Sequence, residues 1–309
     1  ALTVALQSAP VLAQDNTSGL LRGVVSSTSG QQLSDITITV KHLEQGFSRS
    51  VQTNSKGEYV LRGLPVGRYQ VLASRDGQTP VELQQLQISL GQSQVFTPVL
   101  PDSGDIERIG VTATAMRQID TGDSTAGLTF DADTLDLMPV NTGFENVALL
   151  TPGVARSSQF DASSFGGASA AENGYFLNGM NISALRTGIG SINLPWEAIA
   201  QTQVKTGGIS AEYDRFIGGV VNAVSQSGSN EFRYGGEVRL DPAALYSKHN
   251  TVYKPNGSMS INNMASEEQF REANIWLSGP ILEDKAFFYA LLNPRRYNSE
   301  YANSATTAF

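Results

Sequence analysis

The stretch GGVVNAVSQSGSNEFRYGGEVRL, residues 218–240, changes character halfway along. Its first half is small and apolar, SQSGSN forms a polar turn, and its last nine residues alternate between apolar and polar positions. This alternation with a period of two predicts a β-strand. One face carries three charges and the other is apolar, so the strand needs an apolar environment on one side and a polar partner on the other. The apolar face has Phe232, Tyr234, Gly236, Val238 and Leu240, and the polar face has Arg233, Gly235, Glu237 and Arg239.

Two further segments repeat the pattern. In ANIWLSGPI, residues 273–281, the apolar side chains share one face, opposite Asn274, Trp276 and Ser278. A turn over residues 282–285 leads to AFFYALLNPRRY, and a polar excursion from Asp241 to about Arg271 precedes this pair. Strands of about ten residues joined by one long and one short connection are typical of a transmembrane antiparallel β-barrel. Three strands cannot close a barrel and an open edge cannot face lipid, so we expect the barrel to be incomplete in this chain.

Composition excludes several functions. The 309 residues carry a net charge of -8 and no basic run, which argues against nucleic acid as a partner. The absence of Cys excludes disulfides and thiolate metal sites. The two histidines, His42 and His249, have no nucleophile motif near either of them. We therefore expect no enzyme, no catalytic residue, no metal and no cofactor.

The N-terminal hundred residues predict a partial signal peptide and a β-sandwich. ALTVALQSAPVLAQ, residues 1–14, resembles the apolar region of a secretory signal, with Val11-Leu12-Ala13 before the cleavage site. A frayed apolar helix or strand is the alternative. Short β-prone runs between turn residues then predict a β-sandwich over residues 15–100. These runs are LLRGVV, DITITVKHL, FSRSVQT, EYVLRGL, RYQVLAS and LQISL.

The segment between this sandwich and the alternating strands predicts a linker followed by an α+β unit. TPVLPDSGD, residues 97–105, is rich in Pro and Gly and has little to bury. Further on, Asn141 or Thr142 can cap a short helix that ends at Thr151-Pro152-Gly153, with one apolar face. That face has Phe144, Val147 and Ala148. A long loop of small residues, 157–174, precedes three strand-like pieces: YFLNGMNIS, AIAQTQVKT and GGVVNAVS.

Three longer stretches carry a family resemblance. AENGYFLNGMNIS, LPWEAIAQTQVKTGGISAEYDRFIGGVVNAVSQSGSNEFRYGG and LSGPILEDKAFFYAL resemble the plug and first barrel strands of TonB-dependent outer-membrane receptors. TNSKGEYVLRGLPVGRYQV, residues 53–71, is similar to the carboxypeptidase-regulatory-like (transthyretin-type) sandwich that begins the Oar-like branch of that family. This chain departs from the family at Asn178, where Asp is common, and at Asp214, where Gly is common.

The resemblance implies a mainly β chain in five parts. A partial signal peptide (1–14) and the β-sandwich (15–100) come first. A linker with a TonB box (101–118), an α+β plug (119–231) and the first barrel strands (232–309) follow. The protein would lie in the outer membrane of a Gram-negative bacterium, with its N-terminal domain in the periplasm. It would bind an unknown extracellular ligand and import it with energy from TonB and its inner-membrane complex. Outer-membrane lipid would be its other partner.

The implied site residues are a TonB box and two loop arginines. An isolated β-prone segment can add to the edge of a partner's sheet, although this one could equally be the first strand of the next domain. The box comprises Asp105, Ile106, Glu107, Arg108, Ile109, Gly110, Val111, Thr112 and Ala113. Arg156 and Arg186, on loops, are candidates for contact with an anionic group of the ligand. The alternative function is a surface adhesion or assembly protein without transport, which would not need residues 105–113.

Overall fold

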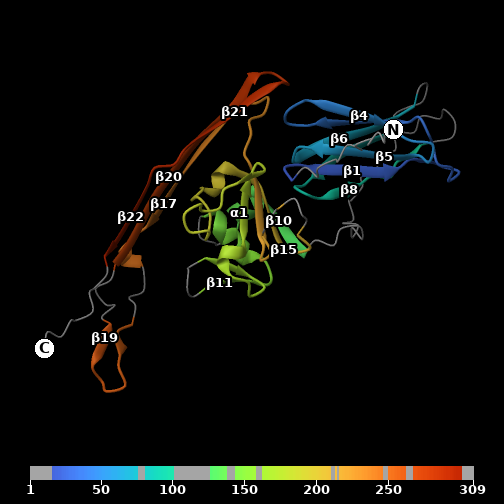
Figure 1. Cartoon of the computed structure of the whole chain (residues 1–309). Coiled ribbons are helices and arrows are strands. Elements are labelled where there is room, and N and C mark those ends of the chain that lie inside the picture. Colours follow the sequence, from blue (N-terminus) through green and yellow to red (C-terminus); the bar gives the residue numbers. More distant parts are fainter. Residues whose placement is uncertain are drawn as a thin grey trace, which may run out of the picture.

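The computed structural model describes residues 16–75, 81–100, 126–137, 143–157, 162–209, 213, 216–245, 250–261 and 267–300. The fold is mainly β, with 54% strand and 9% helix. Figure 1 shows an N-terminal sandwich, a central unit and a long C-terminal sheet. The signal peptide at 1–14 and the TonB box at 105–113 lie outside the described residues. In the described part, none of the helices has the length and apolar character needed to cross a membrane.

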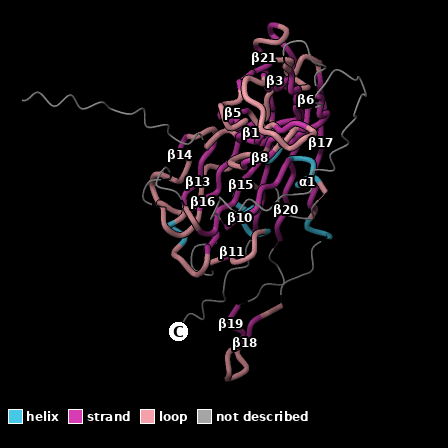
Figure 2. Tube along the Cα trace, turned by 90° about the vertical axis from the view of Figure 1, so that its right-hand side faces the viewer, coloured by secondary structure: helices cyan, strands magenta, loops and turns pink. Residues whose placement is uncertain are grey.

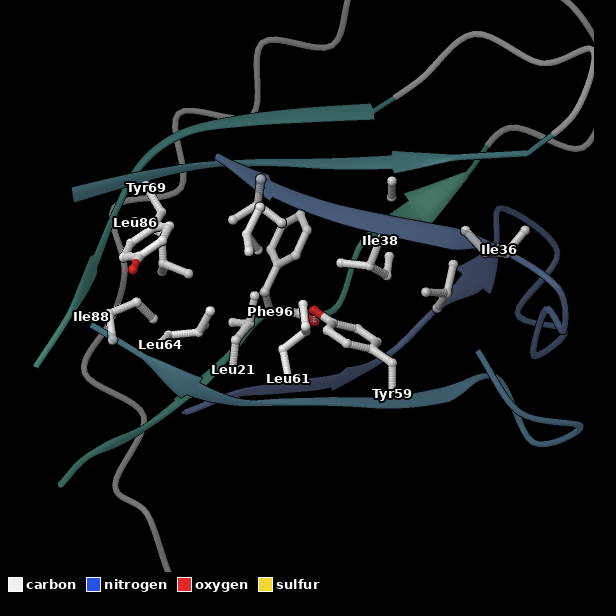
Figure 3. Close-up of a cluster of buried hydrophobic side chains, with 14 of the residues drawn as sticks. Leu21, Ile36, Ile38, Tyr59, Leu61, Leu64, Tyr69, Leu86, Ile88 and Phe96 are labelled. Atoms are coloured by element: carbon white, nitrogen blue, oxygen red, sulfur yellow. Dashed lines mark hydrogen bonds between the residues drawn. The ribbon is translucent and has the colours of Figure 1, made fainter. Parts of the chain in front are cut away.

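The N-terminal sandwich packs a three-stranded sheet, β5-β1-β8, against a four-stranded sheet, β4-β3-β6-β7. Alternate residues of the strands face inward, as the sequence predicts, and Figure 3 shows these side chains meeting between the sheets. The Tyr59 hydroxyl donates to Phe96 O at 2.6 Å, which satisfies its polar atom within the core. The strands are β1 (Gly19–Val24), β2 (Ser26–Ser27), β3 (Thr37–His42), β4 (Ser48–Gln52), β5 (Glu58–Leu64), β6 (Gly67–Ser74), β7 (Val81–Ile88), β8 (Ser93–Val95) and β9 (Val99–Leu100), with β2 and β9 forming a separate pair.

The central unit is a five-stranded sheet, β10-β15-β16-β13-β14, in which β13 and β16 are parallel. Short helices pack against this sheet, and the buried side chains between them form a core that includes Phe144, Tyr175, Trp196 and Val221. Its strands are β10 (Ala126–Asp131), β13 (Gly174–Leu177), β14 (Met180–Asn181), β15 (Ile199–Gly207) and β16 (Val220–Ser225), beside the separate pair β11 (Val154–Arg156) and β12 (Ser163–Phe165). Its helices are α1 (Ala132–Asp136) and the 3-10 helices η1 (Phe144–Leu150), η2 (Ala170–Glu172) and η3 (Trp196–Ala198).

The capping prediction for the helix at 144–150 is wrong. The element is a 3-10 helix, η1, whose N-cap is Gly143, a residue without a side chain that could cap it. The chain enters η1 through the extended backbone of Gly143, which holds the N-cap position, and the two predicted caps, Asn141 and Thr142, lie outside the described residues. The predicted apolar face is confirmed, because Phe144, Val147 and Ala148 are all buried.

The C-terminal sheet is built on one long strand. β20 (Glu267–Leu282) pairs with β17 (Arg233–Asp241) on one side and with β21 (Ala286–Leu292) and β22 (Arg295–Glu300) on the other. The predicted short turn after residue 282 is confirmed. The connection before β20 is shorter than expected, because Phe270 and Arg271 already pair with Asp241 and Leu240. This connection contains η5 (Ala243–Leu245), β18 (Val252–Tyr253) and β19 (Met259–Ile261).

The two faces of this sheet have the polarity that the sequence predicts. On one face Tyr234, Val238 and Ile281 are 83%, 68% and 67% exposed. On the other face Glu272 and Asn274 are 4% and 1% exposed. Figure 1 shows the sheet standing along one side of the central unit, which accounts for the covered face. Apolar side chains outside and polar ones inside invert the arrangement of an ordinary soluble sheet.

Candidate functional site

The polar face of the C-terminal sheet meets the central unit at Glu197. This residue lies in η3, a single 3-10 turn that Pro195 begins and β15 follows. Asn274 Nδ2 donates to Glu197 Oε1 at 2.7 Å, and Arg239 Nη2 lies 3.0 Å from the same oxygen. The Tyr289 hydroxyl donates to the backbone carbonyl of Glu197 at 2.6 Å. One turn of the central unit is thus bonded to β17, β20 and β21 together.

Arg239 is the cation of this site. Its guanidinium forms ion pairs with Glu237 at 2.7 Å, with Glu197 at 3.0 Å and with Glu272 at 3.6 Å. It also stacks over the Trp196 ring, with Cζ 4.8 Å from the ring centroid. A single positive charge therefore stands among three carboxylates, of which Glu197 and Glu272 are almost fully buried. Such a pair is far harder to break than a surface ion pair, because either partner alone would be left desolvated.

Burial raises the pKa of Glu197, and the nearby carboxylates of Glu272 and Glu237 add to the shift. The backbone hydrogen bond at Glu197 and the charge of Arg239 oppose it. The second carboxylate oxygen, Oε2, is buried and has no hydrogen-bond partner among the described residues. The site therefore disfavours the charged form of Glu197 and depends on Arg239 to retain it.

A cleft of about 450 Å³ opens beside Glu197, between the sandwich, the central unit and the sheet. Trp276 and Tyr289 line it with their rings stacked, 6.2 Å apart and inclined by 17°. Acidic side chains of α1 and its N-cap, Asp131 and Asp133, face it from the central unit. Across the described ranges, no three His, Cys, Asp or Glu side chains gather in a way that could hold a metal ion. The arrangement holds parts of the chain against one another.

The sandwich is bonded to the central sheet through the loop after β7. Leu90 N donates to Gln201 Oε1 at 2.5 Å, and Gln203 Nε2 donates to Leu90 O at 3.1 Å. Gly91 lies against Gln203, where a Cβ would be 2.7 Å from Oε1. Both glutamines lie on β15 and are buried. The loop is therefore fitted to this strand at backbone distance.

The two arginines expected to meet a ligand are not brought together. Arg156 is exposed at the end of β11 and donates from Nη2 to Asn146 Oδ1 at 2.9 Å. Arg186 is exposed in the turn at residues 185–187 and makes no hydrogen bond or ion pair with another described residue. Within the described part of the chain the two side chains make no contact with each other, so their role in ligand binding stays a prediction.

The sequence analysis did not identify Glu197 or its hydrogen-bond partner Tyr289 as site residues. The stretch LPWEA gives a signal, since a charge beside Trp at the start of a buried strand requires a counter-charge. The identity of that counter-charge, Arg239, is not visible from 42 positions away in the sequence.

The N-terminal residues match a known family. The model of the carboxypeptidase regulatory-like domain matches residues 21–101. The N-terminal sandwich is a carboxypeptidase regulatory-like domain. It precedes a chain that is 27% identical, over 301 residues, to the TonB-dependent transporter Oar of Myxococcus xanthus. That alignment covers 94% of this chain and 27% of Oar, so the chain spans about a quarter of the relative's length. The resemblance to the Oar-like branch is confirmed.

Solved structures similar to this chain match mostly in part and with low scores. One is the dioxygenase domain of a dioxygenase carbohydrate-binding protein fusion from Streptomyces sp. SirexAA-E. It is 14% identical, with a TM-score of 0.24, and the match covers 29% of this chain and 86% of that one. Another is BcpA, the major pilin subunit of Bacillus cereus, 15% identical with a TM-score of 0.22 over 28% of this chain and 31% of that one. The assignment of the carboxypeptidase regulatory-like domain therefore comes from its sequence match.

Proposed function

We propose that this chain belongs to a TonB-dependent receptor of the outer membrane, which binds a ligand outside the cell and imports it with energy from TonB. The similarity to a TonB-dependent transporter suggests both the receptor role and the outer membrane. The similarity to a transporter and to a regulatory-like domain also suggests a protein that is not an enzyme. The observation that carries the proposal furthest is the two-sided C-terminal sheet, with Tyr234 and Val238 exposed on one face and Arg239 directed to Glu197 on the other.

In this proposal residues 232–309 are the first strands of a transmembrane β-barrel. The exposed face would contact hydrocarbon, which favours large apolar side chains and tolerates no open strand edge. The other face would line the interior, where polar side chains need partners. The bonds from Glu197 to Arg239 and Asn274 are such partners.

The central unit, residues 119–231, would be the plug inside that barrel. Its five-stranded sheet carries Glu197 to the inner face of β17, β20 and β21. A force on the plug would have to break this charged contact before the plug could move. The mechanism therefore assigns Glu197 and Arg239 to holding the resting state.

The contacts of the sandwich support its location in the periplasm. Bacterial barrels have short periplasmic turns and long extracellular loops. Asn230 N donates to Glu44 O in the sandwich at 3.0 Å, and Asn230 Nδ2 donates to Asp284 Oδ1 at 2.7 Å. Asp284 lies in the short turn between β20 and β21, so the sandwich lies at the short-turn end. β11, with Arg156, lies toward the opposite end in Figures 1 and 2 and is the better candidate for an extracellular surface.

The energy for import would reach the plug through residues 105–113. The outer membrane has no ATP and no sustained ion gradient, so work must arrive mechanically. Addition of this segment to a sheet edge of TonB would join the chains by backbone hydrogen bonds. The segment precedes β10, so a pull on it would act on the first strand of the plug.

The test measures binding of a purified periplasmic domain of TonB to the full-length receptor in lipid nanodiscs. Val111→Pro removes a backbone donor and fixes φ. We expect the affinity for TonB to fall at least tenfold, because the complex loses about one backbone hydrogen bond and the fixed φ adds strain. Val111→Ala keeps the donor and should bind like the wild type. Gln118→Pro places the same residue outside the box and should also bind. Unchanged binding by Val111→Pro would overturn the TonB-box assignment.

Import is tested in cells. Growth of strains with and without the gene on defined nutrient panels identifies a ligand, and uptake of that ligand is then measured with and without TonB. We expect uptake to require TonB and an intact residue 111, while ligand binding to the cell surface persists in Val111→Pro. Uptake that continues without TonB would overturn the transport proposal.

A further inference from the structure

The turn between β3 and β4, residues 43–46, is the point where the sandwich reaches the C-terminal sheet. Gln45 Nε2 donates to Gly228 O at 3.0 Å and to Ser227 Oγ at 3.1 Å. Asn230 N donates to Glu44 O at 3.0 Å. The turn thus uses one side chain and one backbone carbonyl to bind the polar corner, residues 227–230, that precedes β17.

The fit on the other side of the turn is close. Gly46 has φ of +74°, and a Cβ there would lie 1.9 Å from Asp284 Oδ1. Asp284 is itself tied to the corner, since its N–H donates to Asn230 Oδ1 at 2.9 Å and its Oδ1 accepts from Asn230 Nδ2 at 2.7 Å. The turn, the corner and the hairpin turn of β20 and β21 therefore form one connected set of hydrogen bonds.

His42 determines the shape of the turn from inside the sandwich. Its Nδ1 accepts from Glu44 N and from Gln45 N, both at 3.2 Å. An atom that accepts two N–H groups carries no proton, so the ring proton is on Nε2, which lies 3.5 Å from Val66 O. The ring is 3% exposed and packs between Phe47 and Tyr69, with centroids 5.2 and 4.8 Å away.

We infer that residues 43–46 form a latch between the sandwich and the rim of the C-terminal sheet, and that the latch closes only while His42 Nδ1 is unprotonated. A proton on Nδ1 would face the two N–H groups of Glu44 and Gln45 and remove both hydrogen bonds. These are the residues that hold Gly228, Ser227 and Asn230. Protonation of one buried ring therefore opens the contact between two parts of the chain.

The groups that face the ring allow this switch. Glu44 comes from the turn itself and favours the charged ring, but its carboxylate is paired with Arg68 of β6 at 2.9 Å. Tyr69 presents its ring from β6, and Asp284 lies beyond Gly46 on the hairpin turn. Burial, the largest effect, lowers the pKa of His42, opposed by Val66 O and Glu44. A lowered pKa means that the closed latch is fully stable above the ordinary histidine pKa and loses stability as the pH falls below it.

The test is hydrogen exchange of the full-length receptor in nanodiscs, followed by mass spectrometry at pH values of about 7.5 and 5.5. The peptides that report the latch span residues 42–48 and 227–231, and a peptide in β16 reports the central unit. His42→Asn retains an acceptor near the position of Nδ1 without a titratable ring. Comparison of the two proteins at the same pH cancels the intrinsic effect of pH on exchange. Gln45→Ala removes the side-chain contacts with residues 227 and 228 and leaves His42 in place.

We expect both proteins to protect the latch peptides equally at the higher pH. At the lower pH the latch peptides of the wild type should exchange about fivefold to tenfold faster than those of His42→Asn. The reason is that protonation of one group changes the equilibrium between the closed and the open latch by at most a factor of ten per pH unit. Gln45→Ala should expose residues 227–231 at both pH values. Equal protection of the latch peptides in wild type and His42→Asn at both pH values would overturn the inference. A loss of protection at low pH that is as large in the β16 peptide as in the latch peptides would also overturn it. If His42→Asn does not fold, the wild type alone decides the question. The inference is then overturned if protection of its latch peptides, relative to the β16 peptide, is the same at the two pH values. The latch consists of contacts within this chain, so its test is independent of TonB binding.

Discussion

Gly235 lies directly opposite Trp276 in the register of β17 and β20, and a Cβ on Gly235 would be 2.7 Å from the indole ring. The indole therefore rests on bare backbone, on the face of the sheet that lines the cleft beside Glu197. At the next position, Gly236, the nearest atoms to a Cβ are Asn274 O at 3.2 Å and Ile275 Cγ1 at 3.9 Å. Two adjacent glycines thus face different surroundings, and one of them determines where Trp276 lies.

Gly235→Ala should displace Trp276 and destabilise the contact between the sheet and the central unit. Adding a methyl group to a packed site costs about 1–3 kcal/mol in the free energy of unfolding. Gly236→Ala is the matched control, because its methyl group would point to the exposed face and meet looser packing. Urea unfolding of the full-length protein in nanodiscs gives the change in stability of each variant. The difference in near-ultraviolet circular dichroism between each variant and the wild type reports the displacement of Trp276. Equal unfolding midpoints for the two variants would contradict the packing described here.

Arg239→Gln should destabilise the protein most at neutral pH. The change leaves the carboxylates of Glu197 and Glu272 without a cation. Breaking a fully buried ion pair costs about 3–5 kcal/mol in the free energy of unfolding, and the cost here should be smaller because Arg239 and Glu197 keep some contact with solvent. The pKa of Glu197 is already raised by burial, and loss of Arg239 raises it further. A carboxyl group with a raised pKa binds more protons when folded, so the variant should recover stability as the pH falls toward that pKa.

The rescue of Arg239→Gln is a second substitution, Glu197→Gln. The double variant removes one of the two buried carboxylates and retains Glu272, so it should be more stable than Arg239→Gln at pH 7 and should lose the part of the acid recovery that Glu197 contributes. Unfolding midpoints measured between about pH 5 and 8 decide the question. A double variant no more stable than the single one would show that the Glu197 charge is not the cause.

The sequence predicted the parts of the fold that local periodicity determines. Alternation at Tyr234, Val238 and Arg239 gave both the strand and its two faces, because a period of two assigns each side chain to a side. The same pattern missed the start of β20. EEQFRE lacks apolar alternation, yet Glu267 and Phe270 pair with Glu300 and Tyr297, so bonds to a neighbouring strand outweigh local preference.

The site could be predicted only in part, for a different reason. Arg239 was identifiable as an inward charge, but its partner Glu197 belongs to a separate element brought close by the fold. Gln201 and Gln203 are similar, since their bonds to Leu90 join residues more than 100 positions apart. A polar residue in a buried strand signals that a partner exists, while the identity of the partner depends on tertiary structure.

Thr202 and Gln201 are neighbours on β15 with opposite expected effects. Thr202 Oγ1 is buried and has no hydrogen-bond partner within the described residues, so Thr202→Val should leave stability unchanged or raise it by up to about 1 kcal/mol. Gln201→Leu leaves the Leu90 N–H buried without an acceptor, and should cost about 1–3 kcal/mol. Both are measured as changes in the unfolding midpoint of the full-length protein. A loss of stability in Thr202→Val as large as that in Gln201→Leu would contradict the assigned hydrogen bonds.

Val238→Arg tests whether the exposed face of the C-terminal sheet meets hydrocarbon. Val238 is 68% exposed on that face, and Leu245, beyond the end of β17, is 83% exposed. In water both changes would be mild, because an exposed site accepts a charge. In a bilayer Val238→Arg should lower the free energy of unfolding by about 2–4 kcal/mol if the residue lies near the midplane. Leu245→Arg should lower it by about 0–1 kcal/mol if Leu245 lies near the membrane interface. The measurement is the fraction of full-length protein that folds into lipid vesicles, read from its shifted mobility in unheated gels. If Val238→Arg folds as efficiently as Leu245→Arg, this face does not contact lipid, and an apolar face exposed to water then requires a protein partner.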